Sequence, residues 1–340
     1  MHRVAVLPGD GIGPEVVDAA LKVLDSLQEA YPNLRLEYVY GEAGLNCVER
    51  YGTNLPAETM ELLKGTEACL KGPMTTPEGA GSHVSVAVAI RKAFDLYANM
   101  RPCYSLPNVP AIRDDVDLVV LRENTEGLYA GYEFEVSPGV GLAARIVTRR
   151  ASERIARFAF KLAMRRRRHV TCVHKGNILK LTDGIFKDAV YRVALEYPEV
   201  KVDDVHVDAM AMQLIKRPGD YDVIVTTNMF GDILSDEAAQ VVGGIGVAAG
   251  ANIGDNYAMF EPVHGSAPKY AGKNRANPIA TIYAAGMMLD YLGEADAYKT
   301  LDNAVRRVLR EGKALTYDLG GSSGTREMAE AIAREVLNLV

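Results

Sequence analysis

Short apolar runs alternate with longer amphipathic segments through most of this chain. Apolar, β-branched runs predict strands at 3–7, 34–40, 68–71, 116–121, 170–174, 202–208 and 222–227. Apolar residues spaced three and four apart predict helices at 14–30, 55–64, 84–95, 152–164, 183–196, 280–292, 300–311 and 328–337. Strands that alternate with helices are typical of an α/β fold with a parallel sheet, and we predict that fold class.

Two segments break this alternation. Residues 243–254 are rich in glycine, which predicts a loop. Residues 133–149 alternate polar and apolar side chains on either side of a Pro–Gly turn, which predicts a β-hairpin. We expect this hairpin to form an arm that exchanges with a partner subunit.

Three acidic residues mark the candidate centre of the chemistry. A strand at 222–227 leads into a turn at 228–231 and a helix from about Asp232. Asp232 and Asp236 are four residues apart, so both carboxylates project from one helix face. The helix dipole offsets part of their repulsion, and a hard cation would offset far more. An ordinary acidic helix start explains the pair equally well, but Asp208, which ends another apolar run, favours a divalent-metal site.

Three arginines lie near junctions between regular elements and loops. They are Arg91, Arg101 and Arg122, and Arg122 follows the apolar run 116–121 directly. It therefore emerges at the carboxyl end of a strand, where α/β proteins bind ligands. A guanidinium binds a carboxylate through two parallel hydrogen bonds. Each arginine alone is more often a surface ion pair, but three beside a metal predict a polycarboxylate substrate.

Tyr129 and Lys175 are the candidates for proton transfer. A lysine beside other cations has a lowered pKa and can act as a base, and a tyrosine can relay a proton. A surface lysine and a half-buried tyrosine are the alternatives. Residues 264–272 supply small residues, backbone amides and a lysine, which suit a phosphate. The glycine turn at 8–13 lacks the G-x-G-x-x-G spacing of a Rossmann dinucleotide site.

Composition narrows the function classes further. The 340 residues are 48% hydrophobic and carry a net charge of −6, so we expect about two globular domains and no nucleic-acid partner. The basic run 165–168 fits a solvated helix end better than a nucleic-acid site. No apolar run is long enough to span a bilayer, so no membrane association is expected. The four cysteines have no metal-site spacing, which favours a reducing, cytoplasmic location.

Together these segments resemble the β-decarboxylating dehydrogenases, which comprise the isocitrate, 3-isopropylmalate and homoisocitrate dehydrogenases. The blocks that carry the resemblance are GDGIGPE at 9–15, DLYANMRP at 95–102, RENTEGLYAG at 122–131, HKGNILK at 174–180, GDILSDEAAQ at 231–240 and EPVHGSAPKYAGK at 261–273. The resemblance implies the two-domain isopropylmalate/isocitrate dehydrogenase-like fold rather than a Rossmann fold. Residues 1–98 and 247–340 would form a large cofactor-binding domain, and residues 99–246 a small domain with the dimer interface and an arm at about 133–150.

The resemblance also implies a homodimer with shared active sites and a role for each candidate residue. Mg²⁺ or Mn²⁺ would be bound by Asp232, Asp236 and Asp208 of the partner subunit. The substrate would be held by Ser85, Arg91, Arg101 and Arg122. Lys175 of the partner subunit would assist deprotonation of the C2 hydroxyl, and Tyr129 would protonate the enolate. The nicotinamide cofactor would contact Thr76, Glu261, His264, Gly265, Lys269, Tyr270, Asn277 and Tyr317.

The cofactor choice follows from the residues after Ala-Pro in the block at 261–273. NAD-preferring members carry Asp-Ile there, whereas this chain has Lys269-Tyr270, which is similar to the NADP-dependent isocitrate enzymes. A cation in place of an anion favours a 2′-phosphate. Tyr317 also fits the NADP pattern, but Gly321 stands where a further arginine is expected. We predict NADP, with NAD as the alternative.

The preferred acid depends on the start of the helix before Arg91. Isocitrate enzymes use a Ser and an Asn there, and this chain has Ser85 and Ala87. The valines at 84, 86 and 88 would make the lining less polar. The blocks at 72–77, 175–177 and 269–270 favour isocitrate. We therefore predict oxidation of isocitrate to 2-oxoglutarate with NADP. The alternatives are a 3-isopropylmalate or homoisocitrate dehydrogenase with NAD, or a non-catalytic regulatory subunit, against which the retained catalytic and metal residues argue.

Overall fold

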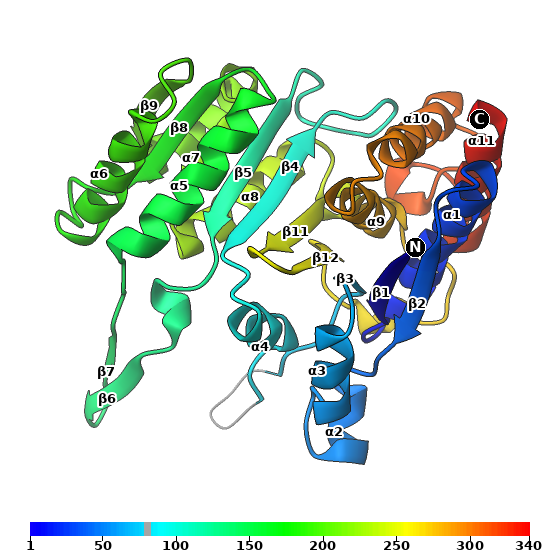
Figure 1. The fold of residues 1–340 in the computed structure, drawn as a ribbon, viewed down its shortest axis with the longest axis horizontal. Helices are drawn as coiled ribbons and strands as arrows, with labels where there is room; N and C mark the ends of the chain where they lie inside the picture. The colour runs from blue at the N-terminus through cyan, green and yellow to red at the C-terminus, as the bar shows by residue number, and fades with distance from the viewer. Residues whose placement is uncertain (78–82) are drawn as a thin grey trace.

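One ten-stranded sheet runs through the computed structural model, which describes residues 1–77 and 83–340. The strand order is β2-β1-β3-β12-β11-β4-β5-β10-β8-β9 (Figure 1). The strands are β1 His2–Leu7, β2 Leu36–Tyr40, β3 Ala68–Lys71, β4 Ala98–Tyr104, β5 Asp117–Glu123, β8 His169–His174, β9 Lys201–His206, β10 Val223–Thr226, β11 Ala249–Ile253 and β12 Ala258–Pro262.

The sheet is parallel toward both edges and antiparallel in the middle. β11 pairs antiparallel with β12 and β4, and β4 pairs antiparallel with β5. The predicted α/β class is confirmed, but the expectation of a wholly parallel sheet is wrong for these central strands. β11 occupies part of the predicted glycine loop 243–254. Short side chains in this strand pack between neighbouring strands, a tertiary effect that overrides local turn preference.

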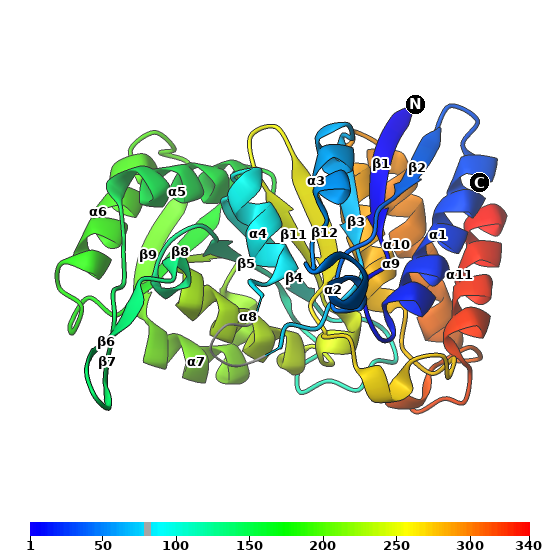
Figure 2. The same cartoon turned by 90° about the horizontal axis from the view of Figure 1, so that it is seen from below.

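Helices cover both faces of the sheet. In Figure 2, α5 and α6 lie on one side and α7 and α8 on the other. Helices α1, α9, α10 and α11 bury one large apolar cluster against the β1 half, and α3 and α4 bury another. No helix in the described ranges is long and apolar enough to cross a membrane. The helices are α1 Gly13–Ala30, α2 Asn46–Tyr51, α3 Ala57–Lys64, α4 Val86–Ala93, α5 Arg149–Met164, α6 Thr182–Ala194, α7 Val207–Lys216, α8 Asn228–Val241, α9 Ile279–Tyr291, α10 Ala295–Glu311 and α11 Thr325–Leu339.

Several predicted boundaries near the candidate metal residues are wrong. Helix α8 begins at Asn228, so the predicted turn at 228–231 is its first turn and Asp232 follows it. β9 ends at His206, and Asp208 lies in the first turn of α7 rather than at a strand end. Separate apolar clusters pack around the outer and middle segments of the chain. The domain boundaries at 98 and 247 stay predictions.

The hairpin projects away from the body of the molecule (Figure 1). It comprises β6 Glu133–Ser137 and β7 Val140–Ala143, which pair antiparallel. The following helix begins at Arg149, and the predicted extent of the arm, about 133–150, stays a prediction. Its large apolar side chains are more than two-fifths exposed, at Phe134, Val136, Val140 and Leu142. A monomer gains nothing from such exposure, which makes the arm a candidate contact surface.

Candidate active site

Two arginines and a tyrosine converge on one aspartate of α8. Asp232 accepts hydrogen bonds from Arg122 and Tyr129 and lies 3.3 Å from the Arg101 guanidinium. Arg101 also bonds Asp236, one turn further along the helix, at 2.9 Å. Five predicted site residues are therefore brought together, and the two carboxylates share one face as predicted.

Close packing of α8 against β5 fixes this cluster. A Cβ at Gly231 would lie 2.6 Å from the Cβ of Arg122, so glycine is required where the helix crosses the strand. The Arg122 Nε donates to the Asn228 side chain at 2.8 Å, at the first residue of α8. The Arg122 side chain is almost fully buried, and its guanidinium is held in a single direction.

The two aspartates have opposite pKa shifts. Burial opposes ionisation of Asp232, but the Arg122 charge, the Tyr129 hydrogen bond and the Arg101 charge together lower its pKa. Burial raises the pKa of Asp236, and the Arg101 charge offsets only part of that effect. Burial and the hydrogen bond to Asp232 raise the pKa of Tyr129, which keeps its phenol protonated. Tyr129 therefore has a proton available for donation at neutral pH.

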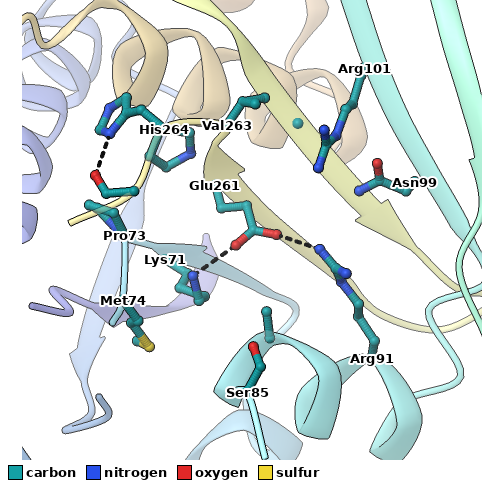
Figure 3. Close-up of a pocket in the computed structure, with 14 residues that line it drawn as sticks. Lys71, Pro73, Met74, Ser85, Arg91, Asn99, Arg101, Glu261, Val263 and His264 are labelled. Carbon is teal, nitrogen blue, oxygen red and sulfur yellow. Dashed lines mark hydrogen bonds and ion pairs between the residues drawn. The ribbon is translucent and has the colours of Figure 1, made fainter. Parts of the chain in front are cut away.

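A neighbouring cavity contains a second charged group (Figure 3). The Glu261 carboxylate pairs with Lys71 at 2.8 Å and with Arg91 at 3.1 Å, and accepts from Asn252 at 2.8 Å. Burial opposes its ionisation, but Lys71 and Arg91 outweigh that effect and lower its pKa. Arg101 lines the same cavity and joins it to the aspartates of α8.

Lys71 and Asn99 are functional candidates that the sequence analysis missed. Lys71 ends the buried strand β3, and a charged residue that closes an apolar run was the available signal. Asn99 lies on β4, a strand that was not predicted. Ser85 and Ala87 line the cavity, as expected. The valines at 84, 86 and 88 do not line it, and Val86 instead points into the core because it lies on the opposite face of the helix start.

Lys175 and Asp208 form a separate pair. The Lys175 Nζ lies 2.5 Å from an Asp208 carboxylate oxygen. Within residues 1–77 and 83–340, neither side chain bonds Asp232 or Asp236, and no three acidic, histidine or cysteine side chains are gathered closely enough to hold a metal. A single chain thus separates the two halves of the predicted metal set, so their union across a dimer stays a prediction.

The predicted cofactor residues lie in separate places. His264 and Gly265 line the cavity with Glu261, and burial lowers the pKa of His264. Lys269, Tyr270 and Tyr317 form a separate surface group. The remaining two are Asn277, which donates to Asp318 at 3.0 Å, and Thr76, which lies in the loop after β3.

Asp232 and Asp236 fit a divalent cation by the chemistry of their donor atoms. Carboxylate oxygens are the ligands that Mg²⁺ and Mn²⁺ prefer. The Asp236 side chain is 58% exposed and Asp232 is 32% exposed, so both can be reached by an ion. Two carboxylates leave the remaining coordination positions for substrate, water or a third protein ligand.

The chain is similar in sequence to proteins of known family. Residues 3–332 match the family model described as "Isocitrate/isopropylmalate dehydrogenase". The chain is 50% identical to 3-isopropylmalate dehydrogenase of Methanothermobacter thermautotrophicus, over 98% of each chain. It is 48% identical to isocitrate/homoisocitrate dehydrogenase of Thermus thermophilus, over 99% of each.

A solved structure shows the same fold. The crystal structure of isocitrate dehydrogenase from Methylococcus capsulatus superposes with a TM-score of 0.94 at 47% identity, over 99% of this chain and 100% of that one. The predicted two-domain fold type and the predicted enzyme class are therefore confirmed. The chain belongs to the isocitrate/isopropylmalate dehydrogenase family, whose members are β-decarboxylating dehydrogenases that depend on NAD(P) and a divalent metal.

Proposed function

We propose that this protein oxidises a 3-substituted malate at C2 and releases its C3 carboxylate as carbon dioxide, with 3-isopropylmalate as the first candidate and NADP as the oxidant. The observation that carries the reaction type is the convergence of Arg101, Arg122 and Tyr129 on the two aspartates of α8. Guanidinium groups suit the carboxylates of the acid, and the aspartates suit a divalent cation.

In this proposal the arginines bind the substrate and Tyr129 donates a proton. Arg91, Arg101 and Arg122 orient the carboxylates so that the C2 hydrogen faces the cofactor, an entropic contribution to the rate. Tyr129 is held protonated and returns a proton to the carbon that carbon dioxide has left. A bound divalent cation would polarise the C2 oxygen as a Lewis acid. The nicotinamide would accept the hydride from C2.

Lys175 is the proposed acceptor of the C2 hydroxyl proton, acting in the site of a partner subunit. Its Nζ is paired with Asp208 within the chain, so the amine can meet the C2 hydroxyl only when Asp208 releases it. The absence of any bond from this pair to the α8 aspartates, within the described part of the chain, supports its use by a second subunit. The exposed apolar arm supplies a surface for that association.

The C3 substituent of the acid is set by the cavity wall next to Arg91. Ala87 lies there in place of the amide expected for an isocitrate enzyme, and Pro73, Met74 and Val263 add apolar surface. An extra carboxylate without polar partners is costly to bury, whereas an isopropyl group is not. Relatives at 50% and 48% identity are named 3-isopropylmalate and 3-isopropylmalate/3-methylmalate dehydrogenases, which supports this acid over the predicted isocitrate.

Isocitrate is the second candidate because Lys71 and Ser85 line the same cavity. A lysine and a hydroxyl are suitable partners for a third carboxylate. Lys71 is already paired with Glu261 at 2.8 Å, which leaves it less available to a third carboxylate. We therefore rank isocitrate below 3-isopropylmalate.

The test is a matrix of initial rates with 3-isopropylmalate, isocitrate and homoisocitrate, each with NADP and NAD. We expect the highest kcat/KM for 3-isopropylmalate with NADP. In Ala87→Asn, the ratio of isocitrate to 3-isopropylmalate should rise about tenfold, the value of one hydrogen bond to a charged group. Ala93→Asn, on the last turn of the same helix, is the matched control. A wild-type preference for isocitrate would contradict the assignment of the acid.

Mixing two inactive variants tests the shared site. Tyr129→Phe disables the substrate side of a site, and Lys175→Met disables the side contributed by a partner. If the site is shared, a mixed dimer has one site with both defects and one intact site, so about a quarter of wild-type activity should return after subunit exchange. No recovery in verified mixed dimers would place Lys175 and Tyr129 in the same subunit's site.

A further inference from the structure

Two cations and two tyrosines form a surface cluster beyond the substrate cavity. The Arg275 guanidinium carbon lies 4.6 Å from the ring centroid of Tyr317 and 6.0 Å from that of Tyr270. The Lys269 Nζ lies 5.0 Å from the Tyr270 ring, and the two tyrosine rings are 6.1 Å apart. The hydrogen bond from Tyr317 and the Lys269 charge lower the pKa of Tyr270.

The two cations have no carboxylate partner within the described residues, although acids lie nearby. Glu327 lines the adjoining cavity, and its carboxylate accepts from Asn274 at 2.9 Å. Asp318 accepts from Asn277 at 3.0 Å and from Thr316. Both acids are thus engaged by neutral donors. The charges of Lys269 and Arg275 are therefore both available to an external anion.

The backbone at Gly321 leaves no room for a side chain. The resemblance predicts an arginine at 321 in NADP-dependent members, but a Cβ there would collide with the carbonyl oxygen of Leu315. No side chain can be placed at this position while the loop keeps its path. Arg275 lines the same cavity as Gly321 and Tyr317, together with Ser322 and Ser323. Arg275 therefore brings a guanidinium to the cavity where an arginine at 321 would have placed one.

We propose that Arg275 binds the 2′-phosphate of the nucleotide cofactor and replaces the arginine that Gly321 excludes. This inference rests on the proposed use of NADP. The planar guanidinium can donate two parallel hydrogen bonds to a phosphate, and its stacking on Tyr317 fixes its plane. Lys269 adds a second charge, and the hydroxyls of Ser322 and Ser323 are additional donors on the cavity wall.

The experiment measures binding without turnover. Isothermal titration of the intact protein with adenosine 2′,5′-bisphosphate and with adenosine 5′-monophosphate isolates the contribution of the 2′-phosphate. Arg275→Met keeps an apolar side chain over the tyrosines but removes the charge. We expect affinity for the bisphosphate to fall about 10- to 100-fold, with the monophosphate unchanged. Arg275→Lys should retain part of the affinity, and Arg310→Met, an exposed arginine of α10, should lose none.

The outcomes separate this inference from the cofactor proposal. An equal loss for both nucleotides would mean that Arg275 only supports the loop, and the inference fails. A wild type that prefers the bisphosphate, with the same preference in Arg275→Met, overturns the role of Arg275 and leaves NADP in place. A wild type without that preference overturns both.

Discussion

Two groups of cationic side chains, one in the cavity and one at the surface, differ in burial and in their partners. At the cavity, Lys71 and Arg91 are buried and both pair with Glu261. At the surface, Lys269 and Arg275 lie against tyrosine rings without a carboxylate partner in the described ranges. Burial makes an unpaired charge expensive, so both buried cations are held against the one Glu261 carboxylate. The surface group has no such constraint and can leave its charge for a ligand.

The largest expected effect is on the stability of the buried group. Glu261→Gln leaves Lys71 and Arg91 without a counter-charge, so the free energy of unfolding should fall by about 3–5 kcal/mol. Glu61→Gln breaks an exposed pair with Lys64 and should cost less than about 1 kcal/mol. Urea denaturation measures both. Equal losses of unfolding free energy in the two variants would show that the buried Glu261 pairs stabilise the fold no more than an exposed pair does.

Substitutions in the surface group should change the preference for NADP over NAD and leave the stability of the fold unchanged. Replacing Lys269-Tyr270 by Asp-Ile changes the sign of the charge that would face the 2′-phosphate of NADP. The ratio of kcat/KM for NADP to that for NAD should fall about 100-fold, with unfolding unchanged within about 0.5 kcal/mol. Steady-state rates at one ionic strength give the ratio. An unchanged ratio would defeat the electrostatic explanation of cofactor choice.

The pH dependence of stability is a smaller effect with a definite sign. The pKa of Glu261 is lowered in the folded protein, so its contribution is fully present above the pKa of an unfolded glutamate, about 4.3. The contribution is lost as the pH falls from that value toward the folded pKa. The stability difference between wild type and Glu261→Gln should therefore be constant from about pH 5 to 7 and shrink below that. A difference that grows in acid would contradict the assigned shift.

Local patterns predicted the parallel outer parts of the sheet better than its antiparallel centre. Strands β1, β3 and β10 are short apolar runs, and each was predicted within about two residues, the usual uncertainty of element ends. β4 and β11 contain Asn99, Asn252 and Gly250, which carry weak strand preference. Their pairing depends on neighbours distant in sequence, and no local pattern encodes it.

Local patterns also limited what could be predicted about the candidate site. Asp232 and Asp236 could be placed on one helix face from their spacing, since helix geometry is local. The ion pairs of Lys71 with Glu261 and of Arg101 with Asp236 join residues more than a hundred positions apart. The proposed role of Arg275 rests on the steric closure at Gly321, which only the structure shows. Most of the candidate groups could therefore be named from the sequence, whereas their bonding partners came from the structure.

Removal of divalent cations tests the central claim most directly. The purified protein would be stripped with a chelator and assayed with 3-isopropylmalate and NADP, by following the absorbance of the reduced nicotinamide while Mg²⁺ is added back. Activity should vanish on chelation and return with Mg²⁺. In Asp232→Asn, kcat should stay about 1,000-fold lower at any Mg²⁺ concentration. Undiminished turnover in the metal-free protein would contradict a reaction centred on the aspartates of α8.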